Sequence, residues 1–169
     1  MATLLAEGRP RFSVAPQSFD RVLAAIASIL LVVLVVAIAR GSQEWARVPG
    51  LVWAHVATIA VALVLTPVML LRRRGDRLHR TLGWIWTSAM MLTALLSFGV
   101  RGINGGSLSW IHILSALTII QAPRIAITAR KKQHQKHRNA VRTLITGALA
   151  IAGVFTLLPS RMLGHWLFS

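Results

Sequence analysis

Cysteine and tyrosine are absent from this chain of 169 residues, and acidic residues are scarce. Without cysteine the protein has no disulfide, no thiolate nucleophile, no cysteine-bound iron–sulfur cluster and no cysteine-bound zinc. It also contains no Gly-rich phosphate loop, no G-x-S-x-G motif and no H-E-x-x-H motif. The sequence therefore gives no support to the soluble-enzyme classes that these features identify.

Negative charge is what the chain lacks most. Four residues are Asp or Glu, whereas 19 are Lys or Arg, and the formal net charge is +15. Only 14% of residues are charged and 55% are hydrophobic, with a mean hydropathy of +0.64. The basic residues form short clusters between long apolar runs, whereas a basic soluble domain would spread them over one face. This pattern indicates a small integral membrane protein, with no nucleic-acid partner, whose basic clusters set its topology and attract anionic lipid headgroups.

Five apolar runs are long enough to cross a bilayer, which takes roughly 20 helical residues. They do not alternate between polar and apolar residues, so we expect helices and not strands. About twenty residues precede the first run and no A-x-A cleavage site follows it, which disfavours a signal peptide. We expect an all-α integral membrane protein with a tail at 1–20, a single transmembrane domain at 21–160 and a short tail at 161–169. The five expected helices cover about residues 22–40, 51–71, 80–100, 109–129 and 139–159.

The basic residues fall mostly on one side of this topology. Leaving aside Arg124 within the fourth run, 14 Lys or Arg belong to the N-terminal tail and to the segments after the second and fourth runs. Four belong to the other side: Arg40, Arg47, Arg101 and Arg161. Since Lys and Arg are enriched in cytoplasmic loops, we expect a multi-pass protein of a bacterial inner (cytoplasmic) membrane, with its N-terminus in the cytoplasm and its C-terminus outside.

A sequence repeat relates the second and third runs to the fourth and fifth. The triplet "WAH", which ends at His55, is matched by "WIH", which ends at His112. A histidine followed by arginine then opens the next run in each case, His79 in "RLHRTLGWIW" and His137 in "QKHRNAVRTL". The separations are 24 and 25 residues. Both hairpins run from outside to inside and back, so they form a parallel repeat, and we expect these four helices to form a four-helix bundle.

The repeat puts two pairs of histidines at two depths in the membrane. His55 and His112 form what we call the outer pair, and His79 and His137 form the inner pair. Two imidazoles that face each other suit the axial positions of a haem iron, and such a haem carries electrons because no coordination position is open. The sequence thus predicts one or two b haems with these four histidines as iron ligands. The alternative for each histidine is an interfacial residue with a water or backbone partner.

The arginines beside the inner pair have two interpretations. Arg80 and Arg138 can hold haem propionates through charge-assisted hydrogen bonds, or they can extend to lipid phosphates. The run "RRRGDR" can likewise dock an anionic electron donor from the cytoplasm, or it can simply fix the topology. The sequence alone leaves both choices open.

Two resemblances accompany these motifs. The segment "RRRGDRLHRTLGWIW" followed by "KHRNAVRTL" resembles a bacterial family of membrane proteins of unknown function, domain of unknown function 2306 (DUF2306), over about residues 50–145. At its second site this chain has "HRNAV" where the family pattern has "HRWM". The resemblance therefore carries over His137 and Arg138 but not Asn139 and Ala140.

In architecture the chain resembles a cytochrome b561-type core, in which four helices hold two b haems. There the first and third core helices hold the outer haem, and the second and fourth hold the inner one. The resemblance implies that His55 and His112 bind the outer haem and that His79 and His137 bind the inner one.

The functional prediction is a transmembrane electron-transfer protein, a cytochrome b561-like membrane oxidoreductase with two haems stacked across the bilayer. Its expected partners are membrane lipids, a quinol or small anionic electron donor, and a larger membrane complex. The alternative is a non-catalytic subunit or scaffold of such a complex, without a cofactor. A transporter is disfavoured because the four acidic residues lie in tails or loops and not within the apolar runs.

Overall fold

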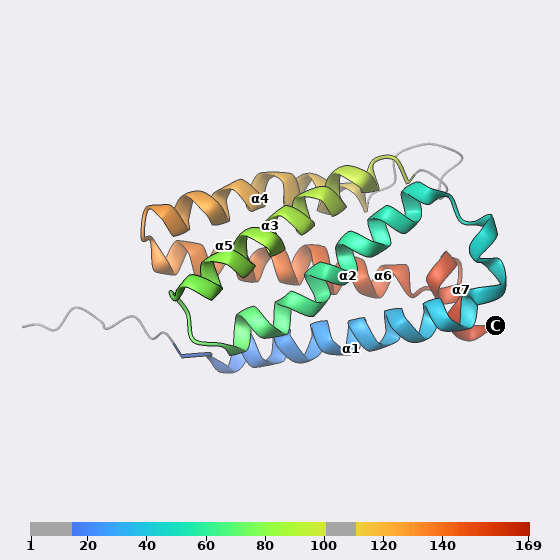
Figure 1. Cartoon of the computed structure of the whole chain (residues 1–169), viewed down its shortest axis with the longest axis horizontal. Helices are drawn as coiled ribbons and strands as arrows, with labels where there is room; N and C mark the ends of the chain where they lie inside the picture. Colours follow the sequence, from blue (N-terminus) through green and yellow to red (C-terminus); the bar gives the residue numbers. More distant parts are fainter. Residues whose placement is uncertain (1–14, 101–110) are drawn as a thin grey trace, which may run out of the picture.

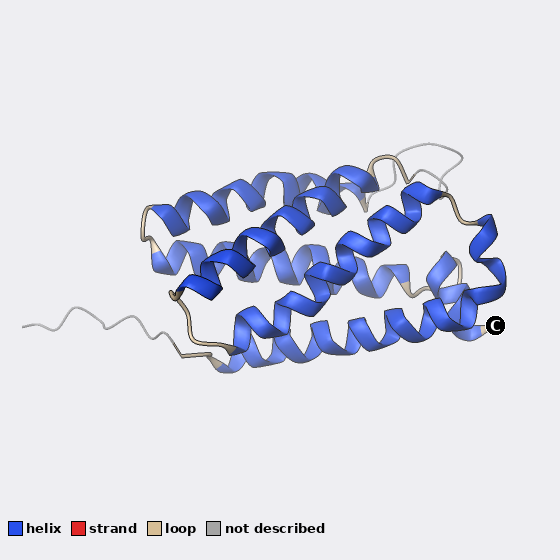
Figure 2. Ribbon diagram, in the orientation of Figure 1, coloured by secondary structure: helices blue, strands red, loops and turns tan. Residues whose placement is uncertain are grey.

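The computed structural model describes residues 15–100 and 111–169, and every regular element in those ranges is helical (Figures 1 and 2). Residues 1–14 of the predicted tail and residues 109–110 of the predicted fourth helix lie outside the described ranges. The absence of strands from the described ranges confirms the all-α class. The elements are α1 (Ser18–Arg40), the 3₁₀ helix η1 (Gly41–Arg47), α2 (Gly50–Leu71), α3 (Arg77–Ser97), α4 (His112–Arg130), α5 (His134–Leu144), the π-helix η2 (Ile145–Ile151), α6 (Ala152–Thr156) and α7 (Met162–Phe168).

Four helical segments of the described chain are long and apolar enough to cross a membrane. They are α1 with η1, α2, α4, and the continuous segment that runs from α5 through η2 into α6. α3 has 21 residues, but it is not among the four because Trp, Thr, Ser and Gly take the place of aliphatic residues along it. Length and composition thus agree with a multi-pass membrane protein.

The outward faces of these helices are apolar, as a lipid environment requires. Val32 of α1 is 61% exposed, Ile113 of α4 is 69% exposed and Val154 of α6 is 59% exposed. A water-soluble monomer rarely exposes contiguous apolar surface on this scale. The exposed apolar faces are therefore compatible with helices that lie in a bilayer.

The long helices pack in a ring in which each contacts the next. α1 packs on α2, α2 on α3, α3 on α4, and α4 on α5, while η2 returns to pack against α1 (Figure 1). Small and aliphatic residues fill the interior, and Ala37, Met90 and Leu144 are almost fully buried. The repeat in the sequence does not include the first helix, whereas in the structure α1 packs against both α2 and η2.

Two helices begin earlier than the change from polar to apolar residues predicted. α3 begins at Arg77 because Asp76 caps it, accepting the His79 backbone N–H at 2.7 Å. This bond, with a second from Arg72, holds the pKa of Asp76 below its usual value. The stabilisation that these two bonds give is therefore fully present above the normal pKa of an aspartate, and it is lost as the pH falls through the lowered pKa of Asp76. α5 begins at His134, five residues before the predicted start, and no side chain caps it.

A buried carboxylate ties three parts of the ring together at the end that carries the basic loops. Asp20 of α1 is 0% exposed. It accepts Nη2–H of Arg74 at 2.6 Å, from the α2–α3 loop, and Nε–H of Arg142 at 2.9 Å, from α5. The Arg142 guanidinium also donates to the Gln17 side-chain oxygen at 2.7 Å. Asp20 thus fixes the start of α1 against two basic segments distant in sequence.

The opposite end is closed by the C-terminus, which forms a helix and not only a tail. Trp166 of α7 is 3% exposed and lies over Gly41, where a Cβ would come within 2.0 Å of its ring. Its indole N–H donates to Glu44 at 3.1 Å. The rings of Trp53 and Trp166 are 6.4 Å apart. The buried Trp166 therefore docks α7 against the start of η1.

Candidate cofactor-binding cavity and histidine pairs

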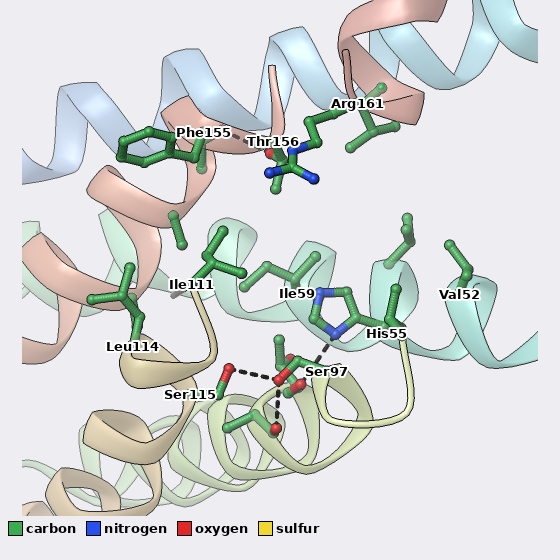
Figure 3. Close-up of a pocket in the computed structure, with 18 of the residues that line it drawn as sticks. Val52, His55, Ile59, Ser97, Ile111, Leu114, Ser115, Phe155, Thr156 and Arg161 are labelled. Carbon is green, nitrogen blue, oxygen red and sulfur yellow. Dashed lines mark hydrogen bonds between the residues drawn. The ribbon is translucent and has the colours of Figure 1, made fainter. Parts of the chain in front are cut away.

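A cavity of about 660 Å³ lies inside the ring, toward the end where α7 docks (Figure 3). Every long helical segment contributes to its wall: Leu34 from α1, Ile59 from α2, Met90 from α3, Leu114 from α4 and Leu149 from η2. Its volume falls in the usual range for sites of small molecules and cofactors, about 300–1,000 Å³. Its wall is mostly apolar, with a few polar groups, as such sites generally are.

His55 and His112, the predicted outer pair, both line this cavity. His55 lies on α2 and its ring points into the cavity (Figure 3). Its Nδ1 is 3.1 Å from the backbone carbonyl oxygen of Thr93 on α3, so Nδ1–H donates and Nε2 is the basic nitrogen. A histidine that binds a metal usually donates its other ring N–H to a carbonyl in this way.

His112 is the first residue of α4 and is 6% exposed. Its Nε2 lies 3.2 Å from the Ser97 carbonyl oxygen, and its ring centroid lies 5.6 Å from that of Phe98. The hydroxyls of Ser97 and Ser115 are 2.6 Å apart beside it. Both outer histidines thus bond to backbone carbonyls near the end of α3, those of Thr93 and Ser97.

The inner pair lies at the basic end, away from this cavity. His137 on α5 donates Nδ1–H to the Ile125 carbonyl oxygen of α4 at 3.1 Å. Nδ1 of His79 on α3 is buried and, among the described residues, has no hydrogen-bond partner. The two imidazoles are close enough to interact electrostatically. The structure therefore brings the inner pair to one end of the ring from two different helices.

Arg80 and Arg138 follow these histidines but differ in environment. Arg80 is exposed on the first turn of α3. Arg138 is 7% exposed and lies near Arg74, Arg142 and Asp20. An arginine buried to this extent is not extended toward lipid phosphates.

Three features of the site have no counterpart in the sequence interpretation. Arg161, assigned only to the topology, lines the cavity with its guanidinium. The π-helix η2 also lines the cavity, and π-helical turns often occur at functional sites. Asp20 was taken as part of a tail. No motif marks these residues, because each depends on contacts between distant segments.

Within the described ranges, no three His, Asp or Glu side chains gather in a way that could hold a metal ion.

Comparison with protein-family models, with curated proteins and with solved structures finds no match to this chain.

Proposed function

We propose that this protein is a transmembrane electron-transfer protein that binds b-type haem through paired histidines. The observation that carries the proposal is that His55 and His112 both line one cavity, from helices that are not neighbours in sequence. The hydrogen bond from His55 to Thr93 adds support, since it leaves Nε2 as the basic nitrogen. The cavity volume and its mostly apolar wall also fit a planar, largely apolar cofactor.

A second haem is proposed for the inner pair. His137 has the hydrogen bond to a carbonyl that is typical of a metal ligand. His79 has a buried ring nitrogen with no partner among the described residues, and such an atom is costly unless something satisfies it. Arg80 and Arg138 follow the two histidines and are proposed to bind the propionates of this haem.

The proposed topology has five transmembrane helices, with α3 as the fifth. α3 connects α2 to α4 by running the length of the ring between them (Figure 1). Its 21 residues span about 31 Å, which matches the thickness of a bilayer core. With both basic loops in the cytoplasm of a bacterium, the N-terminus lies inside the cell and the C-terminus outside.

In this proposal the haem supplies one-electron chemistry and the protein supplies its ligands and surroundings. The histidines hold the axial positions, and the apolar wall excludes water from them. The basic loops at the cytoplasmic end attract a quinol or a small anionic electron donor and bind lipid headgroups. Packing against a larger membrane complex is compatible with the exposed apolar faces.

Difference spectra of the purified protein test the proposal. We expect a b-type band in the reduced-minus-oxidised spectrum, at close to one or two haems per chain. His55→Ala and His112→Ala should each remove the outer haem, because one ligand cannot hold the iron in bis-histidine form. His134→Ala and His165→Ala are the matched controls, since both side chains are exposed and neither is predicted to bind iron.

A colourless wild-type protein would contradict the haem proposal. It would favour the alternative function, a non-catalytic subunit or scaffold of a larger membrane complex, in which the histidines only bind backbone carbonyls.

A further inference from the structure

Among residues 15–100 and 111–169, Arg161 is the one arginine or lysine on the wall of the cavity. It directly precedes α7, and its side chain is partly buried. The guanidinium extends into the cavity across from His55 (Figure 3). A charge in a mostly apolar cavity is costly unless a counter-charge lies close to it.

No counter-charge reaches Arg161 from the part of the chain that the structure describes. The acidic residues there are Asp20, Glu44 and Asp76, and each is engaged elsewhere. Glu44, at the same end as Arg161, accepts the indole N–H of Trp166 and lies 3.9 Å from His165. The guanidinium thus has unused donors for an anion that comes from outside the chain.

The rest of the cavity is shaped for an apolar body. η2 and α6 present small side chains to it, including Ala148, Ala152 and Gly153. The Ser97 and Ser115 hydroxyls are already paired with each other. The wall that the described residues form therefore has one arginine at one side, and most of the rest of it is apolar.

We propose that Arg161 makes this cavity a binding site for a carboxylate attached to a large apolar body. Guanidinium and carboxylate match in geometry, and their hydrogen bonds strengthen when water is excluded. Two sources carry this chemistry in a membrane: a haem propionate and the carboxylate of a free fatty acid. Nothing in this inference requires the histidines to bind iron.

Paired acid and ester ligands provide the test. The purified full-length protein is titrated in detergent with haem, haem dimethyl ester, oleic acid and methyl oleate, with quenching of Trp fluorescence as the readout. We expect at least one acid to bind wild-type protein roughly tenfold or more tightly than its ester, because only the acid forms the charged hydrogen bonds. The acid that shows this preference identifies the source of the carboxylate.

Arg161→Gln should abolish the preference for the acid, while leaving the affinity for the ester near that of wild type. Arg161→Lys should keep part of the preference, since it retains the charge but loses the fork of donors. Arg47→Gln is the matched control, because Arg47 is exposed in η1 at the same end and does not line the cavity. It should behave as wild type.

The inference is overturned if wild-type protein shows no preference for either acid, or if Arg161→Gln retains one. If Arg161→Gln fails to fold, as judged by thermal unfolding, the wild-type preference and the Arg161→Lys variant decide the question. Preference for oleic acid without a haem spectrum would refute the proposed function and keep this inference. If Arg161→Gln binds haem as wild-type protein does, and wild-type protein shows no preference for oleic acid, the proposed function is kept and this inference is refuted.

Discussion

A single buried carboxylate joins three segments at the residue scale. Asp20 is fully buried and pairs with both Arg74 and Arg142, whose side chains are 15% and 18% exposed. Each of these ion pairs is therefore partly shielded from water, unlike the exposed pair of Arg72 and Asp76. Partly buried pairs are costly to break because the remaining partner loses its compensation.

Asp20→Asn should lower the free energy of unfolding by roughly 2–3 kcal/mol, because two arginines lose a charged acceptor. Thermal unfolding of the detergent-solubilised protein measures the effect. Asp76→Asn is the matched control: it keeps an oxygen to cap α3 and loses only an exposed ion pair, so its Tm should equal that of wild type. If Asp20→Asn and Asp76→Asn lowered the Tm equally, the buried Asp20 network would stabilise the protein no more than an exposed ion pair does.

The two histidine pairs lie at opposite ends of the ring and use different helices. Their haems, if both are bound, should therefore be lost independently. We expect His55→Ala and His79→Ala each to halve the haem absorbance, and the double variant to abolish it, as measured by pyridine haemochrome assay. Loss of all haem on His79→Ala alone would contradict independent sites. A full complement of haem in that variant would restrict the proposal to the outer pair.

At the element scale, α7 closes the ring although its sequence offers little indication of it. Gly164 allows the close approach, since a Cβ there would lie 2.0 Å from the Leu158 carbonyl oxygen. A methyl group cannot be accommodated against backbone, so the helix would have to move. Such a movement would also shift Arg161, which precedes α7.

Gly164→Ala should detach α7 and speed hydrogen–deuterium exchange of residues 162–168. Gly50→Ala is the matched control, because no atom lies within 4 Å of the added methyl group. That variant should exchange at the wild-type rate in the same segment. Protection of α7 that survives Gly164→Ala would show that this contact does not hold the helix in place.

At the scale of the whole molecule, the number of crossings decides on which side of the membrane each loop lies. Because the chain has no cysteine, single-cysteine variants report position without a background. Ser42, Arg73 and Gln135 are exposed and lie in η1, the α2–α3 loop and α5. If α3 crosses the bilayer, residues 73 and 135 share a side; if it does not, they lie on opposite sides.

We expect a membrane-impermeant maleimide to label Ser42→Cys in intact cells, and to label Arg73→Cys and Gln135→Cys only after permeabilisation. This outcome would support five crossings with the N-terminus inside. Labelling of both Ser42→Cys and Gln135→Cys in intact cells would indicate that α3 does not cross. Labelling of both Arg73→Cys and Gln135→Cys, but not Ser42→Cys, in intact cells would reverse the orientation.

The helical class, the multi-pass character and the approximate positions of the long helices could all be predicted from the amino-acid sequence. These properties follow from the length and composition of continuous apolar runs, because a helix in lipid forms its backbone hydrogen bonds within its own segment. The sequence also singled out His55 and His112, which share a cavity in the structure, because the repeat of "WAH" and "WIH" is visible along the chain. The prediction that they bind haem awaits the spectra.

Only the tertiary structure decided how these segments meet. The place of α1 in the ring, the burial of Asp20 between two arginines, and the entry of Arg161 into the cavity all depend on residues far apart in sequence. The observed start of α3 also differs from the predicted one. The cap at Asp76 extends this helix through polar residues that hydropathy assigns to a loop. Composition is a property of each segment alone, whereas pairing and burial depend on which segment packs beside it.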